Sequence, residues 1–277
     1  MHDGQGMKLT FIGGGNMAAA LIAGLAGQMT AGENIHVVDP NPSQLDKLAS
    51  AFGVTTASAI GQQVAASDVI VLAVKPQQMR EVAAALLPHL SDTPLLLSIA
   101  AGIRSSDLSR WLGGYGAIVR TMPNTPALIG QGITGMVAIA GVSEEHRAAA
   151  DNIMKAVGQT VWLDHEDLID PVTAVSGSGP AYVFFFIEAM QQAAVELGLS
   201  AEQGKQLALA TFTGAAQLAA QSPDDVSLLR ERVTSKGGTT YAALQSMEAA
   251  GVKQAIVAAV KAAAARGREL GDELGRD

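Results

Sequence analysis

The sequence has no cysteine among its 277 residues. Disulfides, thiolate nucleophiles and thiolate metal sites are therefore excluded, and a reducing compartment, the cytoplasm, is the expected location. No run reaches the roughly 20 apolar residues that a membrane-spanning helix needs, and the first ten residues lack a signal-peptide pattern. We therefore expect no membrane partner.

Charged and aromatic residues are also scarce. Charged residues make up 16% of the chain, aromatic residues make up 4%, and the formal net charge is −8. Nucleic acid is bound by clustered basic side chains and by stacking rings, so it is not expected as a partner. Any anionic ligand must be held locally. The 30 glycines point instead to many tight turns and close backbone approaches.

Short β-branched or leucine-rich runs alternate with alanine-rich helical stretches from residue 7 to about residue 162. This alternation predicts an α/β fold with a Rossmann-type, doubly wound parallel sheet. Most runs are apolar at consecutive positions, as strands buried on both faces require. The expected strands are residues 8–13, 35–39, 69–74, 94–100, 117–122, 135–140 and 160–163.

Helical periodicity dominates after "DHEDLIDP" (residues 164–171), which predicts an all-α C-terminal domain. We place the boundary between residues 1–168 and 169–277. The expected helices are residues 180–197, 201–220, 224–233, 239–249 and 252–274. The stretch 181–198 is too apolar for a solvated surface, so it packs either in the core of its own chain or against a partner subunit.

The string "FIGGGNMA" (residues 11–18) follows the first expected strand and opens a helix. Gly13, Gly15 and Ala18 occupy the three small-residue positions of the dinucleotide fingerprint. The second strand ends in Asp39, roughly 20 residues further on, where a ribose-reading carboxylate belongs. Such a carboxylate would repel a 2′-phosphate, so Asp39 favours NADH over NADPH. The alternative is that Asp39 only caps the turn at "DPNP".

The string "VTSKGGTTYAAL" (residues 233–244) places hydroxyls and two glycines before a helix. One interpretation is a plain N-cap that satisfies the free N–H groups of the helix. The other is an anion cradle, in which the same N–H groups and hydroxyls hold a carboxylate. The sequence "DHEDLID" is interpreted as a solvated linker, and no metal site is expected.

Together with "AVKPQ" (73–77), "SIAAG" (98–102), "MPNTPAL" (122–128) and "VSGSGPAYVF" (175–184), these strings closely resemble pyrroline-5-carboxylate reductase. The resemblance covers the chain from residue 7 onward. It implies reduction of the cyclic imine 1-pyrroline-5-carboxylate to proline by hydride transfer from NADPH or NADH. It also implies homo-oligomers that assemble through the helical domain.

The resemblance also implies site residues. Together with Asp39, which the spacing of the glycine motif indicates, the expected cofactor-binding residues are Gly13, Gly14, Gly15, Asn16, Met17, Ala18, Asp39, Ala73, Val74, Lys75, Pro76, Ala100, Ala101, Gly102 and Asn124. The substrate set is Val233, Ser235, Gly237, Gly238, Thr239 and Thr240, with Thr240 as the catalytic group at the ring nitrogen.

Two positions depart from the family pattern. Lys236 stands where many members carry proline, and Ile60 stands where many carry an asparagine near the adenosine ribose. Family members commonly favour NADPH, against the argument from Asp39. Two rivals are a β-hydroxyacid dehydrogenase and a non-catalytic dinucleotide sensor, and "SKGGTT" is the feature that a sensor would not need.

Overall fold

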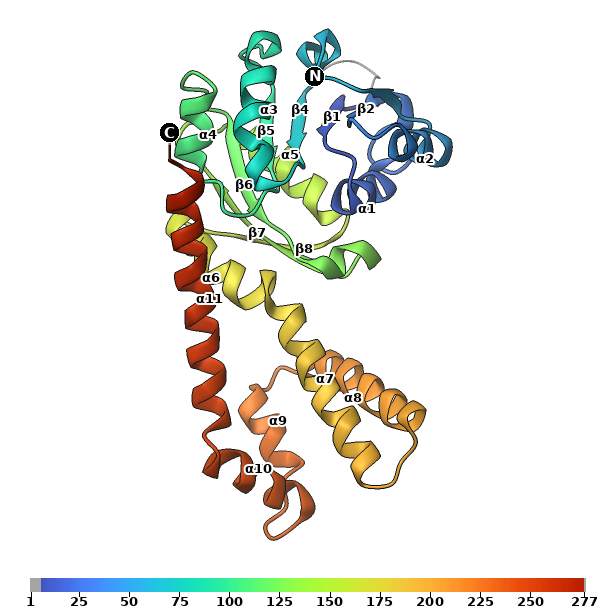
Figure 1. Ribbon diagram of the computed structural model, residues 1–277, viewed down its shortest axis with the longest axis vertical. Coiled ribbons are helices and arrows are strands. Elements are labelled where there is room, and N and C mark those ends of the chain that lie inside the picture. Colours follow the sequence, from blue (N-terminus) through green and yellow to red (C-terminus); the bar gives the residue numbers. More distant parts are fainter. Residues whose placement is uncertain (1–5, 277) are drawn as a thin grey trace. The chain divides into compact units, whose positions relative to one another are not determined.

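Eight strands form one sheet in the computed structural model, which describes residues 6–276 (Figure 1). The strand order is β3-β2-β1-β4-β5-β6-β7-β8. The strands are β1 (Leu9–Ile12), β2 (Ile35–Val38), β3 (Thr55–Ala57), β4 (Val69–Leu72), β5 (Leu95–Ser98), β6 (Ile118–Met122), β7 (Gly132–Ala138) and β8 (Gly158–Trp162). The predicted Rossmann-type α/β class is confirmed, and each of the expected strands overlaps an observed one.

Two features of the sheet were not predicted. β3 is a short, polar strand beside β2, and its exposed residues give no apolar signal. β7 runs antiparallel to β6, whereas all other pairs are parallel. The connection from Met122 to Gly132 is too short for the helical crossover that a parallel pair needs.

Helices cover both faces of the sheet. They are α1 (Asn16–Leu25), α2 (Pro42–Phe52), α3 (Met79–Leu86), α4 (Ser105–Trp111), α5 (Glu144–Lys155) and the single turn α6 (Ile169–Val172). Successive strand residues point to opposite faces, so Val71 belongs to the core cluster that includes residues of α1, α2 and α5, while Ile70 belongs to the cluster that includes residues of α3 and α4. The sheet is therefore buried on both sides, as the apolar runs predicted.

The C-terminal part is helical, as expected. Its helices are α7 (Gly179–Glu196), α8 (Ala201–Gln221), α9 (Val226–Arg232), α10 (Thr239–Ala249) and α11 (Val252–Leu274). The chain forms two compact units, one running to Ser178 and resuming at Ala263, the other comprising Gly179–Ala262. The sheet unit thus extends past residue 168, because α6 buries Ile169 in it, and it takes in the last turns of α11.

The helical unit buries few of its own side chains. Between residues 179 and 262 only Ile187, Gly204 and Ala208 are buried. Helices α7 and α8 meet through Phe186 and Phe212, whose ring centroids are 6.4 Å apart. Most apolar side chains of α7 stay exposed, so packing within the same chain does not account for this helix. Within residues 6–276, no helix is long and apolar enough to cross a membrane.

Candidate functional site

The loop between β1 and α1 carries the glycine motif. Gly13 has a φ of +103° and its N–H donates to the Val38 carbonyl at 2.8 Å. A Cβ on Gly13 would collide with the carbonyl of Ala73, so only glycine fits. At the N-cap of α1, by contrast, a Cβ built on Gly15 has no atom within 4 Å. This open space beside the start of α1 fits a pyrophosphate.

The strand order reverses around β1, which lies between β2 and β4. Open α/β sheets bind ligands at such a switch point, beyond the carboxyl ends of the strands. The predicted residues Ala73, Val74, Lys75 and Pro76 follow β4 there, and the Ala73 N–H donates to Ile12 at 2.8 Å. In α1, Asn16 is exposed, Met17 is half-buried and Ala18 is fully buried in the core.

Asp39, directly after β2, closes the same loop from the other side. Its Oδ2 accepts a hydrogen bond from the Gly14 N–H at 2.8 Å. Its Oδ1 accepts one from the Asn41 N–H, also at 2.8 Å. Asp39 therefore caps the turn at residues 39–41, and its half-buried carboxylate is held at the edge of the glycine loop. Its contact with a ribose stays a prediction.

The next loop follows β5 in the sheet. Ala100 is buried, Ala101 is exposed, and Gly102 adopts a φ of +77°. Asn124, after β6, uses its side chain structurally, because its Nδ2 donates to Ser176 at 3.1 Å and its Oδ1 accepts from Ile133 at 3.0 Å. A cofactor contact of Asn124 stays a prediction.

The hydroxyl-rich loop ends at Gly238, the N-cap of α10. No side chain caps this helix. Among residues 6–276, the hydroxyls of Ser235, Thr239 and Thr240 have no hydrogen-bond partner, whereas Thr234 donates to the Arg230 carbonyl at 2.6 Å. A plain side-chain N-cap is therefore not what these hydroxyls form, which leaves them and the first N–H groups of α10 available to an anion.

The glycines of this loop shape it. Gly237 has a φ of +75°, and a Cβ on Gly238 would lie 2.8 Å from the Ser235 hydroxyl oxygen. Val233, at the end of α9, is 66% exposed. The structure thus gathers most of the predicted cofactor residues at one edge of the sheet. It gathers the predicted substrate residues on one loop and one helix turn of the helical unit.

Sequence reasoning missed the role of Glu166 in "DHEDLID". Its Oε1 accepts from the Arg120 Nη1 at 2.8 Å and from the Ser105 N–H at 2.7 Å. Arg120 is buried within β6. The segment is therefore tied to the sheet at this residue, rather than being solvated throughout. Across the described part of the chain, no three His, Asp or Glu side chains are grouped to hold a metal ion.

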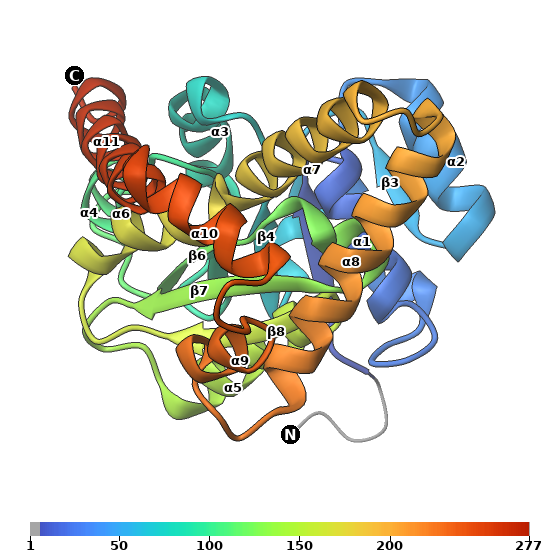
Figure 2. The same cartoon turned by 90° about the horizontal axis from the view of Figure 1, so that it is seen from below.

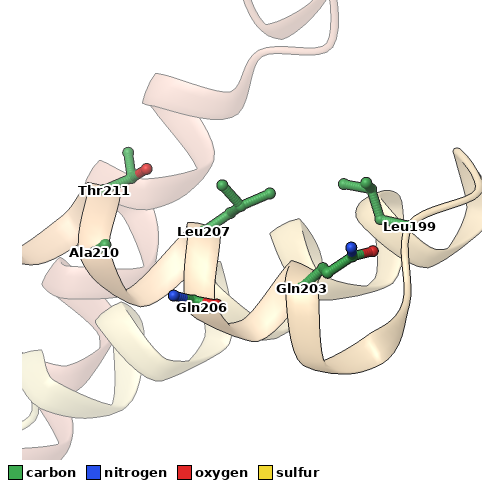
Figure 3. A pocket seen from close by; sticks show the side chains of 6 residues that line it. All are labelled: Leu199, Gln203, Gln206, Leu207, Ala210 and Thr211. Atoms are coloured by element: carbon green, nitrogen blue, oxygen red, sulfur yellow. The ribbon is translucent and has the colours of Figure 1, made fainter.

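A groove of about 550 Å³ runs along α8 (Figure 3). Its lining combines apolar side chains with two amides and one hydroxyl. These are Leu199, Gln203, Gln206, Leu207, Ala210 and Thr211. Leu207 is 56% exposed, and on α7 Phe184 and Phe185 are 60% and 73% exposed. Large exposed apolar side chains on neighbouring helices are typical of a protein–protein interface.

Two family models match the chain. Residues 8–102 match NADP oxidoreductase, coenzyme F420-dependent. Residues 166–270 match pyrroline-5-carboxylate reductase dimerisation. The first range carries the glycine motif and the second carries the helical unit, so the chain is an NAD(P)H-dependent oxidoreductase that forms homo-oligomers.

Solved structures repeat this arrangement. A pyrroline-5-carboxylate reductase from Coxiella burnetii is 39% identical with a TM-score of 0.91, covering 96% of this chain and 99% of that one. The Plasmodium falciparum enzyme with NADP bound is 32% identical with a TM-score of 0.85, covering 96% and 98%.

Sequence relatives match over nearly their full length. Pyrroline-5-carboxylate reductase of Pseudomonas aeruginosa is 46% identical over 269 residues, covering 97% of this chain and 98% of that protein. The Haemophilus influenzae enzyme is 42% identical, covering 96% and 98%. The chain therefore belongs to the pyrroline-5-carboxylate reductase family.

Proposed function

We propose that the chain reduces 1-pyrroline-5-carboxylate to L-proline with NADPH or NADH, the last step of proline synthesis. The observation that carries this proposal beyond family membership is the start of α10. There the hydroxyls of Ser235, Thr239 and Thr240 have no partner within residues 6–276. A dinucleotide sensor would need the glycine loop but not these groups.

The substrate is a small ring with one carboxylate, and the protein is acidic, with a formal net charge of −8. The carboxylate is held by the first N–H groups of α10, the positive end of its dipole, and the hydroxyls of Ser235 and Thr239. Gly237 and Gly238 let the backbone come close, and Val233 borders the loop. Thr240 contacts the ring nitrogen and orients the C=N bond.

The dinucleotide is held by the loops beyond β1, β4 and β5. The backbone at Gly15 and the start of α1 take the pyrophosphate, flanked by Gly13, Gly14 and residues 73–76. Residues 100–102 border the nicotinamide, which supplies the hydride when bound. Asp39 faces the adenosine ribose and favours NADH, since a 2′-phosphate would meet its charge.

The exposed apolar side chains of α7 and α8 form the contact between subunits. Homo-oligomers are expected of the family model, and a partner subunit would cover the surface that the helical unit leaves exposed. Cytoplasmic location stays a prediction from the cysteine-free sequence.

The test is turnover. Purified protein is mixed with 1-pyrroline-5-carboxylate, and the loss of NADH or NADPH absorbance is followed for wild type, Thr240→Ala, Thr240→Ser and Thr234→Ala. Losing a hydrogen bond to a charged group should lower kcat/KM of Thr240→Ala by roughly 10- to 100-fold. Thr240→Ser should recover most of it.

Thr234→Ala is the matched control, because the Thr234 hydroxyl is used within the chain by the Arg230 carbonyl. It should keep near wild-type activity. Dinucleotide binding by the wild type without turnover of either cofactor would refute the reductase proposal and favour a sensor.

A further inference from the structure

The last turns of α11 belong to the sheet unit and lie beside α4 (Figures 1 and 2). Leu274 is half-buried there and packs against the core cluster that contains Ala100 and Ile103. These two residues flank the end of the loop after β5. The end of α11 therefore contacts the stretch 100–102, which borders the nicotinamide in the proposed function.

Gly102 lies directly under Leu274. A Cβ on Gly102 would lie 3.0 Å from the Leu274 Cδ1 and 3.9 Å from the Leu270 Cβ. Gly102 also has a φ of +77°, a conformation that other residues rarely adopt. The glycine thus allows both the turn of the loop and the close approach of α11.

Arg104, two residues further on, holds α11 from the side. Its Nη1 pairs with the Asp272 Oδ1 at 2.7 Å, and its Nη2 donates to the Arg268 carbonyl at 3.2 Å. Gly271 is buried beneath the guanidinium, and a Cβ there would lie 2.9 Å from the Arg104 Nη2. Gly271 therefore gives Arg104 room to lie flat on α11.

Two more arginines bind backbone carbonyls just beyond α11. The Arg110 Nη2 donates to the Gly275 carbonyl at 2.8 Å, and the Arg80 Nη1 donates to the Arg276 carbonyl at 3.2 Å. Carbonyls at the end of a helix lack intrahelical partners and carry its partial negative charge, so cationic side chains stabilise them. Three arginines from the sheet unit thus fix this end of the chain.

We propose that residues 267–276 act as a strap that holds the loop 100–102 in the shape the nicotinamide requires, with Leu274 and Arg104 as positioning residues. The inference rests on the proposed function, because that function places the nicotinamide at this loop. The strap supports the loop from the side of Gly102 that faces Leu274. Its contact with Gly102 is at the loop after β5, so it should act on the nicotinamide end of the dinucleotide.

The test compares a complete cofactor with one that lacks the nicotinamide. Calorimetry on the full-length protein measures Kd for NADPH and for 2′-phospho-ADP-ribose, or for NADH and ADP-ribose if wild type prefers NADH. Leu274→Ala should weaken binding of the complete cofactor by roughly tenfold, which corresponds to about 1.4 kcal/mol. Binding of the fragment should change less than about twofold.

Leu274→Met refills the space and should restore cofactor affinity. Arg266→Ala is the matched control on the same helix, since within residues 6–276 Arg266 forms ion pairs only with Glu269 and Glu273, on the exposed surface of α11. If Leu274→Ala does not fold, the exposed substitution Asp272→Asn frees Arg104 and should give a smaller effect with the same selectivity.

If Leu274→Ala weakens binding of the complete cofactor and of the fragment equally, or changes neither Kd, the proposal that residues 267–276 shape the loop 100–102 is wrong. The wild-type turnover assay is separate from this comparison. A protein that binds both ligands but does not reduce the imine would refute the proposed function, while the difference between cofactor and fragment would still decide whether residues 267–276 shape the loop.

Discussion

The carboxylate of Asp39 accepts a hydrogen bond from the backbone N–H of Gly14 at 2.8 Å, which ties the end of β2 to the glycine loop after β1. Its other oxygen binds the Asn41 N–H at 2.8 Å. The negative charge is thus fixed in position by two backbone groups. A ligand at this edge meets a carboxylate that cannot swing away without losing both hydrogen bonds.

The first prediction concerns cofactor choice. Asp39→Asn removes the charge but keeps an oxygen for the loop, so the ratio of kcat/KM for NADPH to that for NADH should rise roughly five- to tenfold. Asp46→Asn removes the same charge from an exposed position on α2 and should leave the ratio unchanged. Steady-state kinetics with each cofactor measures the ratio, and an unchanged value in Asp39→Asn would exclude a role in selecting the cofactor.

The second prediction separates two glycines of one loop. Gly13→Ala would force a Cβ against the Ala73 carbonyl at a φ of +103°, so the variant should lose more than about 2 kcal/mol of folding stability. Gly15 has a φ of −72°, and a Cβ on it would meet open space. The free energy of unfolding of Gly15→Ala should therefore lie within about 1 kcal/mol of the wild-type value, while its affinity for the dinucleotide should fall. Denaturant melts and calorimetry measure both, and normal binding by Gly15→Ala would argue against a pyrophosphate at this loop.

Local patterns predicted the fold where the deciding forces are local. The helix from Thr239 to Ala249 and the helix from Val252 to Leu274 were placed at their observed ends, because Gly238 and Gly251 mark their starts. The polar strand β3 could not be predicted, because it is little buried and its sequence therefore contains no apolar run. The antiparallel β7 was missed because strand direction depends on the length of the connection, not on the strand itself.

In the candidate site, too, the features set by neighbouring residues could be predicted from the sequence, and those set by distant residues could not. The glycine and hydroxyl motifs were visible in the sequence because their spacing on one turn carries the chemistry. The pairing of Glu166 with Arg120 joins residues 46 positions apart, and nothing near either residue predicts the other. The contact of Leu274 with Gly102 is equally non-local, since it depends on the return of α11 to the sheet unit.

The third prediction follows from that ion pair. The Arg120 side chain is only 6% exposed, so Glu166→Gln would leave a buried guanidinium without a charged partner and should lower the free energy of unfolding by about 3 kcal/mol. Asp167→Asn changes the exposed neighbouring carboxylate and should cost less than about 0.5 kcal/mol. Urea titrations measure both, and Arg120→Met combined with Glu166→Gln should regain part of the loss. Equal stability of the two single variants would contradict a structural role for the pair.

The fourth prediction concerns pH. Burial lowers the pKa of His36 below its ordinary value of 6.5. Its Nδ1 bonds the Thr55 hydroxyl at 2.8 Å, and its Nε2 has no partner within the described chain. The folded protein therefore keeps the imidazole neutral while the unfolded chain takes up a proton below pH 6.5. The contribution of the neutral His36 to the free energy of unfolding is fully present above pH 6.5 and is lost as the pH falls towards the pKa of the folded state.

His36→Asn should accordingly show a shallower loss of unfolding free energy between pH 7 and about pH 5 than wild type does. His165→Asn is the matched histidine substitution at an exposed position and is measured beside it. Urea titrations at several pH values give the slopes. Parallel slopes for His36→Asn and wild type would show that the histidine does not contribute.

The last prediction tests how subunits meet. Phe185 is 73% exposed on α7, next to Phe184 at 60%, in a helical unit that buries only three residues between positions 179 and 262. A charge there would have to be desolvated at an apolar interface, which costs several kcal/mol, so Phe185→Asp should dissociate the oligomer.

Ile129→Asp is the matched control, since Ile129 is 76% exposed but belongs to the sheet unit. Light scattering after size exclusion should give a multiple of the subunit mass for wild type and Ile129→Asp, and the single-chain mass for Phe185→Asp. An intact oligomer in Phe185→Asp would place the interface on another surface and leave the exposed side chains of α7 without a partner.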